Sequence, residues 1–232
     1  MPSVSTFSRV TAAAAAIAAM MATAVIAQQQ PALDPGQLTL NGVDASRVTY
    51  RGRDAVRLVE RDGPAAAAAT ASAGLAVLRG VTLMDGTIEL QVAGAPRTGA
   101  AEGARGFVGV AFRLSPDGSS FENLYLRPTN GRADDQVRRN HSVQYASEPD
   151  FPWPRLRKEF PEKYESYVDL EPGAWTRMRI VVRGATVRLY VHDAQQPMLV
   201  VNDLKLAPRD GGVALWIGPG TEGYFADLKI TR

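Results

Sequence analysis

Two residues of opposite charge that could act on a ligand flank a tight turn in residues 107–128, FVGVAFRLSPDGSSFENLYLRP. Two alternating runs surround the Pro-Asp-Gly-Ser turn, which is typical of two strands joined as a hairpin. Arg113 ends the first run and Glu122 begins the second, so the hairpin would bring them near each other. The pair predicts either an exposed ion pair at the strand ends or a general base, Glu122, that Arg113 orients.

Polar and aromatic side chains suited to sugar recognition follow in the next part of the chain. Amide and guanidinium groups donate to pairs of hydroxyls, and an aromatic ring covers the apolar face of a pyranose. The candidates lie on the second run, on a neighbouring predicted strand and in a proline-rich loop: Asn123, Tyr125, Arg127, Gln144, Tyr145 and Trp153. They predict a carbohydrate-binding surface on one sheet, although Trp153 could instead pin its loop to the fold.

The other candidate groups are a histidine and a pair of aspartates. His141 precedes a predicted strand, where it could act as an acid or base near neutral pH and assist Glu122. Asp134 and Asp135 could bind Ca²⁺ together with loop carbonyls, or they could simply be solvated. Only one other histidine, His192, and no cysteine occur in the chain. We therefore expect no zinc or thiolate site.

Motifs for several other chemistries are missing from the sequence. No G-x-S-x-G elbow occurs, which argues against a serine hydrolase. No E-x-D-x-x-E strand occurs, which weakens the case for a sandwich glycosidase with two carboxylates. The string GPGTEG at 218–223 has dinucleotide-binding spacing but precedes no predicted helix, so it is predicted to be a hairpin loop.

Short alternating runs separated by Gly, Pro, Asp and Asn predict an all-β fold, a two-sheet antiparallel β-sandwich. Alternation is clearest in residues 176–192, which predict a hairpin with matched apolar faces across Gly184. Residues 64–74 and 147–166 are expected to be loops, the second long enough to suggest a functional role. The candidate strands are 48–51, 55–60, 76–78, 87–92, 106–114, 121–127, 142–145, 167–170, 176–183, 186–192, 198–201, 212–217 and 224–230.

The N-terminal 27 residues have the pattern of a secretory signal peptide. Arg9 precedes an alanine-rich apolar run that ends in small residues at 25 and 27. The alternative is a transmembrane anchor, but an alanine-rich run of this length spans a membrane poorly. We expect residues 28–38 to be disordered and 39–232 to form one exported domain, periplasmic or extracellular, with no membrane insertion after cleavage.

The formal net charge of +2 falls by one when Arg9 is removed with the signal peptide. This balance gives no electrostatic footprint for nucleic acid or anionic lipid.

The order of the strands resembles a known superfamily. The strings GTIELQV, FVGVAFR, FENLYLRP, AWTRMRIVVRGATVRLYV, LVVNDLK, GGVALWI and YFADLKI are similar to the concanavalin A-like lectin/glucanase jelly roll. More narrowly, they resemble the 3-keto-disaccharide hydrolase-like domains of exported bacterial proteins. By that resemblance Arg113 and Glu122 occupy the positions of the family's Phe-Arg and Glu elements.

The chain departs from the hydrolase-like pattern at two places. It has VGV at 108–110 where those domains have Asn-Ser-Gly, and LWI at 215–217 where they carry Gln and His. The sequence therefore favours a carbohydrate-binding sandwich. The alternatives are a glycoside hydrolase using Glu122, with Arg113, His141 or Tyr125 as helpers, and a structural or protein-interaction sandwich without a small ligand.

Overall fold

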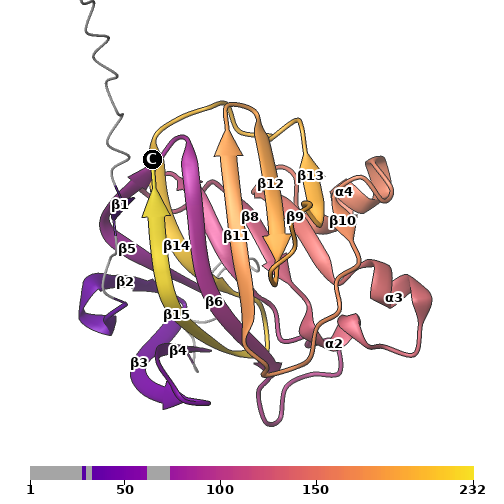
Figure 1. The fold of residues 1–232 in the computed structure, drawn as a ribbon, viewed down its shortest axis with the longest axis horizontal. Helices are drawn as coiled ribbons and strands as arrows, with labels where there is room; N and C mark the ends of the chain where they lie inside the picture. Colours follow the sequence, from indigo (N-terminus) through magenta and orange to yellow (C-terminus); the bar gives the residue numbers. More distant parts are fainter. Residues whose placement is uncertain (1–27, 30–32, 62–73) are drawn as a thin grey trace, which may run out of the picture.

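The computed structural model describes residues 28–29, 33–61 and 74–232, which form two antiparallel sheets packed face to face (Figure 1). This arrangement confirms the predicted all-β sandwich. The eight-stranded sheet has the order β13 (Leu199–Val201), β12 (Thr186–Val191), β11 (Thr176–Arg183), β6 (Gly86–Pro96), β15 (Thr221–Thr231), β4 (Arg53–Glu60) and β3 (Val43–Tyr50), with β1 (Gln28–Gln29) beside β15.

The seven-stranded sheet has the order β10 (Glu165–Ser166), β9 (Val143–Glu148), β8 (Phe121–Leu126), β7 (Val108–Leu114), β14 (Gly211–Ile217), β5 (Gly74–Leu83) and β2 (Leu38–Asn41). The described helices are the 3-10 turn η1 (Pro35–Gln37) and the α-helices α2 (Pro128–Gly131), α3 (Gln136–Asn140) and α4 (Trp153–Glu159). In Figure 1, α3 and α4 lie at the edge of the sandwich near β9 and β10.

Period-two alternation explains why these residues form paired strands with one buried face. In the β11–β12 hairpin, Ile180 pairs with Leu189 and Val182 with Val187, and all four side chains point into the core. The predicted hairpin is thus confirmed. The β7–β8 hairpin is also confirmed, with Phe112 opposite Glu122.

Several local predictions are wrong. Residues 167–170 are not a strand, because the Ser142 hydroxyl accepts from Val168 N–H at 2.7 Å and donates to Val168 C=O at 3.0 Å, in place of a strand ladder. The loop at 218–223 is not a hairpin, because it leads from β14 in one sheet to β15 in the other. The long loop contains α4, whose Leu156 is buried in the core.

The N-terminal part of the chain also differs from the expectation. Residues 28–38 were expected to be disordered, but Asp34 caps η1 by accepting from Gly36 N–H at 2.8 Å, and Leu38 begins β2. The predicted signal peptide, 1–27, and the predicted loop at 64–74 lie outside the described residues, apart from Gly74 in β5. Within the described part of the chain, no helix has the length and apolar character needed to cross a membrane.

Candidate functional site

A pocket lies on the outer face of the seven-stranded sheet because small residues alternate there with aromatic ones. Trp216, Gly109 and Tyr125 face one another in register across β14, β7 and β8. A Cβ on Gly109 would lie 2.2 Å from the Leu124 carbonyl oxygen and 2.6 Å from Tyr125 Cβ. The glycine therefore lets the Tyr125 and Trp216 rings approach to 4.7 Å between centroids.

The neighbouring row of the sheet is made of short side chains. Ala214, Ala111, Asn123 and Ala146 follow one another across β14, β7, β8 and β9. The pocket has a volume of about 710 Å³, and Asn123, Ala146 and the aromatic row form its floor. Loop residues near 97–104, 152–154 and 219–220 form its walls.

Asn123 presents a buried amide to this pocket. Its side chain is 2 % exposed, and within the described part of the chain its Oδ1 atom has no hydrogen-bond partner. A buried polar atom without a partner costs about 1–3 kcal/mol. A ligand that donates a hydrogen bond to Oδ1 would recover that cost.

The aromatic wall of the pocket is held by arginines. Arg127 donates to the Tyr125 hydroxyl at 3.1 Å, and its Cζ lies 5.3 Å from the ring centroids of both Tyr125 and Trp153. Arg157 approaches the Trp153 ring at 4.6 Å while bonding to Glu165. Burial raises the pKa of Tyr125 to about 12, although Arg127 opposes the shift. Trp153 is therefore fixed at the pocket with 42 % of its surface exposed.

Two carboxylates and one guanidinium also line the pocket. Glu60 accepts from Gly220 N–H at 2.7 Å, and Arg97 contributes the guanidinium. Burial raises the pKa of Glu148, whose carboxylate makes no hydrogen bond or ion pair with the described residues.

The positions of Glu122 and Arg113 correct the prediction of an exposed pair. Glu122 is fully buried between the sheets, where it accepts from the Tyr145 hydroxyl at 2.7 Å and from Leu206 N–H at 2.8 Å. Burial raises the pKa of this carboxyl group. The Glu122 carboxylate has no exposed surface and does not line the outer pocket, so its catalytic role stays a prediction that the pocket does not support.

Arg113 is also fully buried, because its φ of +52° turns the side chain out of the expected alternation. Its guanidinium donates to the carbonyls of Met84 at 3.1 Å and Gly184 at 2.5 Å, which joins the connection between β5 and β6 to the turn of the β11–β12 hairpin. Burial lowers the pKa of Arg113, against the opposing charges of Glu122 and Asp85. The residue connects the two sheets and does not face the pocket.

The remaining predicted residues lie outside the pocket lining. His141 caps α3 and places Nε2 2.8 Å from Glu165, and burial lowers the pKa of His141. Gln144 is buried and donates to the Tyr164 carbonyl at 3.2 Å, and Tyr145 points inward to Glu122. The structure therefore brings together Asn123, Tyr125 and Trp153, with Arg127 supporting the two rings.

The aspartate pair has a helix-capping contact. Asp135 Oδ1 accepts from Arg138 N–H at 2.8 Å at the start of α3. Among the described residues, no group of three or more histidine, aspartate or glutamate side chains is arranged to hold a metal ion.

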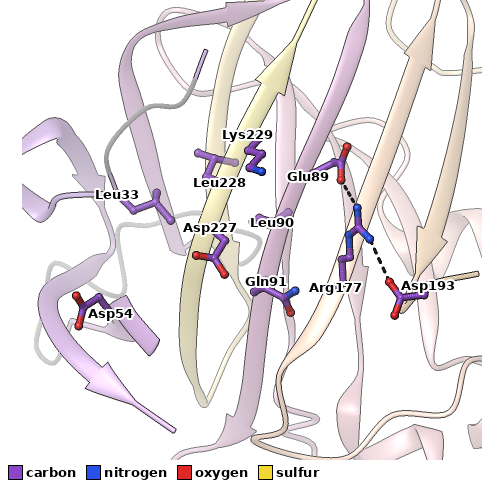
Figure 2. Close-up of a pocket in the computed structure, with 10 residues that line it drawn as sticks. All are labelled: Leu33, Asp54, Glu89, Leu90, Gln91, Arg177, Asp193, Asp227, Leu228 and Lys229. Carbon is purple, nitrogen blue, oxygen red and sulfur yellow. Dashed lines mark hydrogen bonds and ion pairs between the residues drawn. The ribbon is translucent and has the colours of Figure 1, made fainter. Parts of the chain in front are cut away.

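A second cavity of about 740 Å³ lies on the outer face of the eight-stranded sheet (Figure 2). Figure 2 shows Arg177 between Glu89 and Asp193, to which it donates at 2.6 and 3.1 Å. Arg177 and Glu89 are partly exposed and Asp193 is almost fully exposed, so solvent screens both ion pairs. Because exposed pairs of this kind are common on protein surfaces, this cavity is a weaker candidate for a ligand site.

Sequence reasoning missed Phe107, Trp216 and Glu148. Alternation places Trp216 opposite in direction to its buried neighbours Leu215 and Ile217, which was the available signal. Phe107 contacts Tyr125 edge to face, with 6.2 Å between ring centroids. No pattern in the sequence indicated that Glu148 lines the pocket, because its position depends on the pairing of β9 with β8.

Similar proteins are found by structure and not by sequence. No model of a known protein family matches the sequence, and no curated protein matches it. The structure is similar to the carbohydrate-binding module CBM66 from Bacillus subtilis, with a TM-score of 0.55 and 11 % identity over 83 % of this chain and 94 % of the module. It is also similar to a Bacillus subtilis protein of unknown function with a galectin-like fold, with a TM-score of 0.51 and 11 % identity over 84 % of this chain and 89 % of that one.

These likenesses define the class of fold. The protein has the two-sheet antiparallel β-sandwich fold that these two structures share, as the strand pattern in the sequence predicted. At 11 % identity the likeness concerns the fold alone, and function has to be argued from the pocket.

Proposed function

We propose that this protein is an exported carbohydrate-binding protein whose ligand occupies the pocket on the seven-stranded sheet. The observation that carries the proposal is the Asn123 amide, buried at the pocket floor with an Oδ1 atom that has no partner among the described residues. A sugar hydroxyl is a donor of suitable size for such an acceptor. The fold, which a known carbohydrate-binding module shares, supports the proposal.

The aromatic residues supply the second requirement of sugar recognition. Tyr125 and Trp216 form a continuous apolar floor, and Trp153 stands at the wall with much of its ring exposed. The apolar face of a pyranose packs against such rings, while its hydroxyls reach Asn123 and the carboxylates. Because Arg127 and Arg157 hold Trp153, little side-chain entropy remains to be lost on binding.

The test compares two buried asparagines in a glycan-binding assay. Asn130 is a matched control for Asn123, since its Oδ1 is also buried without a partner among the described residues but does not line the pocket. After a glycan array identifies a ligand, we expect Asn123→Ala to weaken its affinity by about 10- to 100-fold, because a lost hydrogen bond costs about 1–3 kcal/mol. Asn130→Ala should leave the affinity unchanged.

The same assay tests the aromatic wall. Trp153→Ala should weaken binding, whereas Tyr167→Ala, which removes another exposed aromatic ring away from this pocket, should not. The proposal is wrong if a broad glycan panel gives no binding, or if the pocket variants and their controls bind a glycan equally well.

A further inference from the structure

Glu148 lies beside Asn123 on the outer face of the seven-stranded sheet. Asn123 pairs with Ala146, and Glu148 follows Ala146 by two residues, so both side chains point to the same face. Diagonal neighbours of this kind in an antiparallel pair are about 7–8 Å apart. One sugar ring could therefore contact the amide and the carboxylate together.

The charge of Glu148 is not compensated by the described residues. Its carboxylate pairs with no cation there, and burial alone accounts for the raised pKa of Glu148. Burying a charged group without a partner destabilises a folded protein. The glutamate therefore costs stability without a compensating contact in the protein, as ligand-binding groups often do.

The rest of the pocket also favours a positive ligand. Its charged lining consists of two carboxylates, Glu60 and Glu148, and one guanidinium, Arg97. The Glu60 carboxylate already accepts from Gly220 N–H, which leaves Glu148 as the carboxylate without such a contact. Aromatic ring faces such as those of Phe107 and Trp216 attract cations as well.

We propose that the ligand is an amino sugar with a free, unacetylated amine, and that its ammonium group binds Glu148 while a hydroxyl donates to Asn123. This inference rests on the proposed carbohydrate-binding function and specifies its ligand class. An ammonium group both donates hydrogen bonds to the carboxylate and neutralises its charge, whereas a hydroxyl only donates. An N-acetyl group carries no charge, keeps only one N–H donor and adds the bulk of the acetyl group.

The experiment measures binding of three forms of the same sugar by calorimetry. The probes are glucosamine, N-acetylglucosamine and glucose, together with the corresponding galactose series. The pH of the measurement lies below the pKa of the amine, so that the amine is protonated. We expect the amine form to bind about tenfold or more tightly than the neutral forms, since hydrogen bonds to charged groups exceed neutral ones by about 1–1.5 kcal/mol.

Two variants make the result specific to Glu148. Glu148→Gln should abolish the preference for the amine while retaining the affinity for the neutral sugar. Glu159→Gln changes the net charge equally on the exposed face of α4 and should keep the preference. Thermal unfolding of both variants verifies that they fold.

The outcomes separate this inference from the proposed function. If neutral sugars bind as tightly as the amine, or if Glu148→Gln keeps the preference, the ammonium assignment is overturned while carbohydrate binding stands. If none of the sugars nor any glycan of the broad panel binds, the proposed function itself fails, and this inference fails with it.

Discussion

Replacement of Glu122 tests whether this residue stabilises the sandwich or acts on a ligand. Its two carboxylate oxygens each accept one hydrogen bond, from the Tyr145 hydroxyl and from Leu206 N–H. A hydrogen bond to a charged group contributes about 1.5–3 kcal/mol. We therefore expect Glu122→Ala to lower the free energy of unfolding by about 3–5 kcal/mol, because both donors lose their acceptor.

The conservative variant should have a smaller effect. Glu122→Gln keeps one oxygen, which can still accept from Leu206 N–H, but presents an amide nitrogen to the Tyr145 hydroxyl. Loss of that one contact should cost about 1–3 kcal/mol. Tyr145→Phe removes the same contact from the other side, so the double variant should show a coupling energy of about 0.5–3 kcal/mol.

Urea unfolding followed by tryptophan fluorescence measures these changes, since the chain contains three tryptophans and no cysteine. The folded form of each variant should bind the glycan with the same affinity as the unmodified protein. The structural assignment would be refuted if Glu122→Ala changed stability by less than about 1 kcal/mol, the typical effect of a point mutation. It would also be refuted if Glu122→Gln abolished ligand binding with stability intact.

Three further predictions concern the pocket. Gly109→Ala should destabilise the fold by about 2 kcal/mol or more and weaken glycan affinity, because its Cβ would clash with the Leu124 carbonyl; unfolding and binding titrations check this. Glu148→Gln should raise stability at neutral pH by about 0.5–2 kcal/mol. Since the pKa of Glu148 is raised, its charge destabilises the fold above that pKa. The stability gained by Glu148→Gln should therefore vanish as the pH falls to the ordinary pKa range of glutamate, which thermal unfolding at several pH values measures. Arg157→Gln should loosen Trp153, and a lack of change in its fluorescence anisotropy would contradict the proposed support.

The fold could be predicted from the sequence because strand alternation is a local property. The pairing of Ile180 with Leu189 follows from apolar residues at every second position on both sides of a turn. The end of that periodicity also marked most strand boundaries. What the pattern could not show is which sheet each strand joins, so the segment at 218–223 was expected to be a hairpin.

Arg113 and Glu122 do not face the pocket, for two different physical reasons. Glu122 has the same parity as Leu124 and Leu126, so alternation itself places it on the buried face. Arg113 has the parity of Ala111 and should have faced outward. Its positive φ reverses that direction, near the register shift that precedes Ala214 in the pairing of β14 with β7.

The two departures from the hydrolase-like pattern are one structural feature. Gly109, within VGV at 108–110, pairs directly with Trp216, within LWI at 215–217. Gly109 lacks the Cβ that would separate the rings of Trp216 and Tyr125. The Trp216 indole therefore packs against Tyr125, which lies on β8 at the other side of β7. Gly109 without the Trp216 indole would leave a gap on this face, and Trp216 opposite a larger residue would clash. The sequence showed both changes as losses of polar groups, whereas their pairing builds the aromatic floor on which the proposed binding function depends.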